Sequence, residues 1–213
     1  MIIYDLIEGD AYSRRIAFKP KTCFVMTQIG KPIPRKAKKI RTILNQYLSE
    51  KDFKSIDAGN DITGKDFLDK IWDMILSVQI GVAIVTEEMS PKTLCNIYYE
   101  LGLMQAMGKE TVVIKTPNAE VPTDFIRTEY IELSSGLKSD INKFFDKLNE
   151  QAEHYAVMAT ELEQNPVLAV DYLRRAYLIT SKPEYKNKAV ETIINCSNLG
   201  KQSHNIVKDF IMH

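Results

Sequence analysis

Three consecutive segments decide the fold: Ile80-Gly-Val-Ala-Ile-Val-Thr86, Asn96-Ile-Tyr-Tyr-Glu-Leu-Gly-Leu-Met-Gln-Ala-Met-Gly108 and Thr111-Val-Val-Ile114. The first and third are apolar runs of strand length. The middle segment is apolar at helical spacing, with Ile97, Leu101 and Met104 on one face. The order strand, helix, strand predicts a parallel β-α-β unit with a right-handed crossover.

One carboxylate, Glu100, lies within this apolar helix, with Asn96 one turn earlier on the same side. Because most other positions are apolar, we expect the helix to be largely buried. A buried carboxylate is costly unless it has a structural partner or faces a cavity. Ligands of parallel sheets collect outside the carboxyl ends of the strands, and we expect the start of this helix to face that edge.

The remaining apolar segments complete a doubly wound α/β fold. Five strands are predicted, at residues 22–26, 53–56, 80–86, 111–114 and 130–133. They alternate with helices at 34–50, 64–78 and 96–108. We expect a flavodoxin-like parallel sheet in the order 2-1-3-4-5, whose switch point lies between the first and third strands.

The chain divides into three parts by pattern. Residues 1–21 are interpreted as an N-terminal arm, residues 22–135 as the α/β domain and residues 136–213 as a helical extension. The extension carries amphipathic helices that begin near residues 137, 166 and 184. They are expected either to mediate a homo-oligomer or a protein contact, or to cap one face of the sheet.

Composition excludes several classes of partner. Lys plus Arg and Asp plus Glu both total 28 in 213 residues, so no net field favours nucleic acid or a membrane surface. The three cysteines lie far apart and make no metal-ligand pattern with the histidines, so we expect a reduced, cytoplasmic protein without a metal. No apolar run has membrane-spanning length.

The basic residues and the acidic residues at the predicted sheet edge can each have either a structural role or a ligand-binding role. The basic run from Lys31 to Arg41 is either a solvated helix face or a phosphate site at a helix N-terminus. Asp57 and Asp61 are either turn residues or ligands of ribose hydroxyls.

The segment Asn96-Ile-Tyr-Tyr-Glu-Leu-Gly, followed by Met107-Gly-Lys and Val112-Val-Ile, is similar to a family signature. It resembles the nucleoside 2-deoxyribosyltransferase-like and bacterial TIR-like nucleotide-binding domains, and the opening Phe24-Val-Met-Thr-Gln-Ile-Gly30 matches their start. The resemblance covers about residues 22–133. It implies that Glu100 cleaves or transfers an N-glycosidic bond. Substrate-binding residues are then expected along the same edge: Thr27, Gln28, Gly30, Asp57, Asp61, Thr86 and Asn96.

The leading prediction is a regulated hydrolase of NADase type, possessing no cofactor and using NAD as its substrate. A carboxylate suits this reaction because the sugar carbon becomes oxocarbenium-like when the base leaves. Two alternatives stay open: a nucleoside deoxyribosyltransferase or nucleotide N-glycosidase, and a non-catalytic sensor that signals through its helical extension. One departure from the family lies in the loop after residue 86, where Glu87 and Glu88 would repel phosphates if they faced the site.

Overall fold

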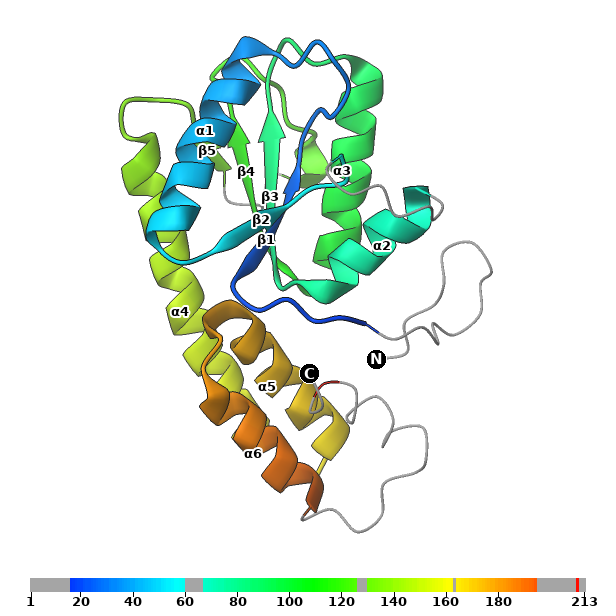
Figure 1. Cartoon of the computed structure of the whole chain (residues 1–213), viewed down its shortest axis with the longest axis vertical. Coiled ribbons are helices and arrows are strands. Elements are labelled where there is room, and N and C mark those ends of the chain that lie inside the picture. The colour runs from blue at the N-terminus through cyan, green and yellow to red at the C-terminus, as the bar shows by residue number, and fades with distance from the viewer. Residues whose placement is uncertain (1–15, 60–66, 126–129, 163, 195–209, 211–213) are drawn as a thin grey trace.

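A five-stranded parallel sheet forms the centre of the protein, as seen in a computed structural model that describes residues 16–59, 67–125, 130–162, 164–194 and 210 (Figure 1). Its strands are β1 (Thr22–Met26), β2 (Lys54–Ile56), β3 (Ile80–Val85), β4 (Glu110–Lys115) and β5 (Tyr130–Glu132). The order is β2-β1-β3-β4-β5, and all neighbours are parallel. The predicted α/β class and flavodoxin-like order are confirmed.

Helices cover both faces of this sheet. The helices of the described ranges are α1 (Arg35–Glu50), α2 (Phe67–Ser77), α3 (Pro91–Ala106), α4 (Leu137–Glu161), α5 (Pro166–Thr180) and α6 (Pro183–Ile194), with a short 3₁₀ turn η1 (Thr123–Phe125). In Figure 1, α1 and α4 lie on one side of the sheet and α2 and α3 on the other. Strands β1 and β3 are buried along their whole length because both of their faces are covered.

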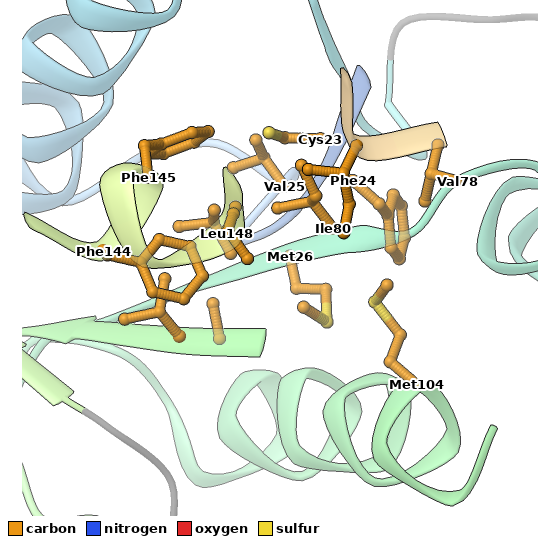
Figure 2. Close-up of a cluster of buried hydrophobic side chains, with 14 of the residues drawn as sticks. Cys23, Phe24, Val25, Met26, Val78, Ile80, Met104, Phe144, Phe145 and Leu148 are labelled. Carbon is orange, nitrogen blue, oxygen red and sulfur yellow. The ribbon is translucent and has the colours of Figure 1, made fainter. Parts of the chain in front are cut away.

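Close packing between β3 and α3 fixes how near the helix lies to the sheet. A Cβ atom added to Gly81 would meet Met104 Sδ at 2.4 Å and Met26 Cε at 3.1 Å. Figure 2 shows the Met26 and Met104 side chains approaching each other from the strand and the helix. Glycine at position 81 therefore makes room for the methionine that anchors α3.

Helix α3 differs from the prediction in its start and in its burial. It begins at Pro91 rather than near Asn96, and the Ser90 hydroxyl caps it by accepting the Thr93 N–H at 3.2 Å. The expectation of a largely buried helix is wrong. Tyr99 is 52% exposed, and the buried residues of α3 lie on a single face.

The first half of α4 belongs to the core of the sheet domain. Phe144, Phe145 and Leu148 are buried in the same hydrophobic cluster as Cys23 and the other strand residues (Figure 2). This half of α4 thus covers a sheet face, as one of the two interpretations of the extension expected. The domain boundary predicted at residues 135/136 stays a prediction.

The rest of the helical extension lies beyond the sheet. Helix α5 packs between α4 and α6, and its Leu178 carbonyl accepts the N–H of Lys21 at 2.8 Å, directly before β1. The extension therefore meets the amino ends of the strands, opposite the predicted site. None of the helices in the described ranges combines the length and apolar character needed to cross a membrane.

Candidate active site

Glu100 is a buried carboxylate on the sheet-facing side of α3. Its side chain shares that face with Ile97, Leu101 and Met104, and the residue is only 9% exposed. Within the described part of the chain, no hydrogen bond or ion pair reaches its carboxylate. Burial alone raises the pKa of Glu100 to about 7. The free energy lost in burying this group is therefore not compensated by a partner among the described residues.

Local sequence signals set the two ends of the helix that carries Glu100. Ser90 and Pro91 fix its start. At the other end, Gly108 adopts a left-handed conformation with φ of 66° and donates its N–H to the Gln105 carbonyl at 2.9 Å. The Lys109 N–H then bonds the Met104 carbonyl at 3.0 Å, which completes a Schellman motif.

Because α3 starts earlier than predicted, Glu100 lies further from the sheet edge than expected. It follows Pro91 by nine residues, a rise of about 13 Å along the axis. Asn96 is exposed and lies nearer the start of the helix. A substrate that reaches Glu100 from the carboxyl edge of the sheet must therefore extend along α3.

Two threonines close the ends of the central strands at this edge. Thr86 follows β3 and Thr116 follows β4, and both are fully buried. Thr116 donates its hydroxyl hydrogen bond to Glu87. In contrast, the Thr86 Oγ1 atom is buried without a hydrogen-bond partner among the described residues. Thr86, like Glu100, is thus a buried polar group without a hydrogen-bond partner in the part of the chain that the structure describes.

The loop after β1 is held by its own side chains. Gln28 Nε2 donates to the carbonyls of Gly30 at 3.0 Å and Pro32 at 2.8 Å. Gly30 is exposed, and nothing lies within 4 Å of a Cβ atom built on it. Thr27 is partly buried. The structure therefore places these three residues beside the carboxyl edge, with the Gln28 amide nitrogen already engaged.

Asp57 takes the turn role that its sequence context allowed. One carboxylate oxygen accepts the Gly59 N–H at 2.8 Å, and the other pairs with Arg41 of α1. The side chain is 6% exposed. These contacts link the end of β2 to α1 and occupy both oxygens, so its expected role in ribose binding stays a prediction. Asp61 lies outside the described residues.

Glu87 is neutralised by a cation from the basic run. Its carboxylate pairs with Lys36, in the first turn of α1, and accepts the Thr116 hydroxyl. The Lys36 hydrogen bond, with that of Thr116, lowers the pKa of Glu87 to about 2. Repulsion of phosphates by Glu87 is therefore reduced, and Lys36 has a partner inside the protein. Both charges are expected near this edge of the sheet from the sequence alone, which does not show that they pair.

The lysine of the Gly108-Lys109 pair in the family-like signature makes structural hydrogen bonds to the backbone. Lys109 Nζ donates to the Val78 carbonyl at 2.5 Å and to the Leu76 carbonyl at 3.4 Å. Burial lowers the pKa of Lys109 to about 7, and Arg174 acts in the same direction. The lysine thereby ties the α3–β4 turn to the end of α2, far from the carboxyl edge.

Neither surface hollow of the helical extension coincides with this edge. One, of about 510 Å³, is lined by residues 160–162, 164 and 165, and another, of about 550 Å³, lies between α4 and α6. In the described ranges, no group of three or more His, Cys, Asp or Glu side chains is arranged to hold a metal ion.

Comparison with models of known protein families gave no match, and comparison with curated proteins also gave none. The family resemblance of the Glu100 segment therefore stays a prediction.

Proposed function

We propose that this protein hydrolyses the N-glycosidic bond of a nucleotide, with Glu100 as the catalytic carboxylate and NAD as the favoured substrate. The supporting observation is that Glu100 is buried, has no partner in the described structure and has a pKa of about 7. Strongly perturbed carboxylates of this kind are concentrated at catalytic sites. The family-like sequence around Glu100 supports the same assignment.

The chemistry follows from charge. When the C1′–N bond of NAD breaks, the bonding electrons leave with the nicotinamide nitrogen, whose ring was cationic and becomes neutral. Positive charge moves to the ribose carbon, where a nearby carboxylate stabilises it strongly because little water separates the charges. Water then adds to C1′ and releases a proton. No general acid is required, since the leaving group departs uncharged.

Binding of a cationic substrate should also shift Glu100 from its protonated form to its ionised form. Burial favours the protonated acid in the free protein. A positive charge nearby favours the carboxylate and lowers its pKa. Binding of NAD would therefore produce the ionised form that the reaction needs.

A second candidate is cleavage or transfer of a purine from its nucleoside or nucleotide. It is favoured by the same pKa of about 7, because roughly half of the Glu100 side chains are protonated at neutral pH. The protonated acid can donate its proton to a departing purine, as general acids do. Free sugar as product indicates hydrolysis, and a new nucleoside indicates transfer.

Chromatography of reaction products tests the proposal directly. Pure full-length protein is incubated with NAD, nucleosides and nucleotides, beside Glu100→Gln and the control Glu88→Gln. The control removes an exposed carboxylate from the loop that precedes the same helix. We expect nicotinamide release to fall at least about 100-fold in Glu100→Gln and to persist in Glu88→Gln.

Near-full turnover in Glu100→Gln would refute the assignment. If the wild type binds a nucleotide and turns over none of the compounds, the protein is a sensor rather than an enzyme.

A further inference from the structure

The C-terminal end of α3 is held by the helical extension. Arg175 of α5 donates from Nη1 to the Gly108 carbonyl at 3.1 Å. The guanidinium lies so close that a Cβ atom on Gly108 would meet Nη1 at 2.6 Å. A side chain from the extension thus packs directly on the residue that ends the Glu100 helix.

Arg175 is itself fixed on several sides. Asp171 accepts its Nε at 3.1 Å and pairs with its Nη2 at 3.0 Å. The guanidinium also lies over the rings of Tyr155 and Tyr172, at 5.8 and 5.5 Å from their centroids. Its side chain is 19% exposed. A planar, multiply bonded arginine of this kind holds its position better than a lysine.

The other sides of the α3 terminus meet the sheet. The same Gly108 carbonyl accepts Gln79 Nε2 at 2.9 Å, from the residue before β3. One turn earlier, Met104 fills the space over Gly81. The last turn of α3 is therefore held between β3 and α5, and Arg175 supplies the contact from α5.

We propose that Arg175 is a positioning residue for Glu100: by fixing the end of α3, it sets how deeply the Glu100 carboxyl lies against the sheet. Helix α3 continues for six residues beyond Glu100, to Ala106, a rise of about 9 Å, and Gly108 follows two residues later. A displacement of the helix end therefore moves the carboxyl with it. The importance of this position for turnover rests on the proposed function, whereas the position itself does not.

The test compares Arg175→Lys with Arg174→Lys. Lysine keeps the charge beside Asp171 but lacks the planar fork in which Nε and Nη2 contact Asp171 while Nη1 donates to the Gly108 carbonyl. Arg174 is the matched control because it also pairs with Asp171 and lies over Phe18, whereas the hydrogen bond to the Gly108 carbonyl comes from Arg175.

Two measurements that need no substrate read out the position of α3. Hydrogen exchange of the Gly108 and Lys109 amides should accelerate at least about 10-fold in Arg175→Lys, since these amides close the helix end. The carboxyl resonance of Glu100, assigned by its loss in Glu100→Gln, should titrate at lower pH as its burial is relaxed. Arg174→Lys should leave both unchanged.

Equal effects of the two substitutions, or unchanged amides and titration in Arg175→Lys, would overturn the proposal. If Arg175→Lys does not fold, Tyr172→Leu removes one ring beneath the guanidinium and should shift both readouts in the same direction. Absence of such a shift would also overturn it. If the proposed hydrolase activity is found, kcat should fall in Arg175→Lys with little change in KM. Failure of that activity would leave the exchange and titration results decisive.

Discussion

Replacing Glu100 with glutamine should stabilise the fold at neutral pH while removing its proposed activity. The glutamine amide has nearly the size of the protonated acid and carries no charge at any pH. The difference between a pKa of about 7 in the folded protein and the ordinary value of 4.5 corresponds to about 3 kcal/mol, at about 1.4 kcal/mol for each pH unit. A gain of this size is large beside typical stabilities of 5–15 kcal/mol.

The sign of the pH dependence follows from the direction of the shift. Between pH 4.5 and about 7, the unfolded chain has lost the Glu100 proton while the folded chain still holds it. The wild type therefore loses stability as pH rises through this interval and loses no more above it. Glu100→Gln should match the wild type below pH 4.5 and exceed it by about 3 kcal/mol at pH 8.

Urea unfolding at a series of pH values measures this difference. Trp72 is the single tryptophan of the chain and is 4% exposed in α2, so its fluorescence reports the loss of packing. Glu88→Gln serves as the control, because that side chain is exposed to water in the folded protein as well as in the unfolded chain. Curves for Glu100→Gln and the wild type that coincide at every pH would refute the reasoning. A glutamine variant less stable at every pH would show that the carboxylate has a structural partner.

Two further predictions concern the framework around the site. A chain that ends at Gly136 lacks Phe144, Phe145 and Leu148, so the exposed sheet face should cause aggregation in light scattering; a monodisperse, folded product would show that the core closes without α4. The pKa of Lys109 is lowered to about 7 in the folded protein, and the ordinary lysine value is 10.5. Between these two pH values the Lys109 side chain is protonated in the unfolded chain and neutral in the folded protein. The wild type should therefore gain stability relative to Lys109→Met between pH 7 and 10 in urea unfolding, and a constant difference would contradict this burial.

Apolar periodicity was sufficient to predict the sheet. A strand that is apolar at every position, such as β3, must be covered on both faces, and a parallel sheet between two layers of helices provides that cover. The start of α3 was missed although its signals were present, since Ser90 and Pro91 form a cap and first position inside a polar stretch that resembles a loop. The Lys36–Glu87 and Arg41–Asp57 pairs join segments far apart in the chain. Local pattern carries no information about which distant charge each one meets, and Asp57 was for that reason ambiguous between turn and ligand.

Helix α3 links Glu100 to the helical extension. Glu100 is costly to bury, and α3 keeps it in place through contacts made elsewhere along the helix. Met104 anchors the helix to β3, and Arg175 fixes its end from α5. Removing the extension should therefore disturb the carboxylate, although no hydrogen bond or ion pair in the described ranges joins α5 or α6 to Glu100 directly. If the proposed NAD hydrolysis is confirmed, the contact from α5 to the helix that carries Glu100 offers one physical route for restraining it. Exchange at the Gly108 amide and titration of Glu100 show whether a change in the extension reaches this carboxyl, whereas turnover is measured separately by product release.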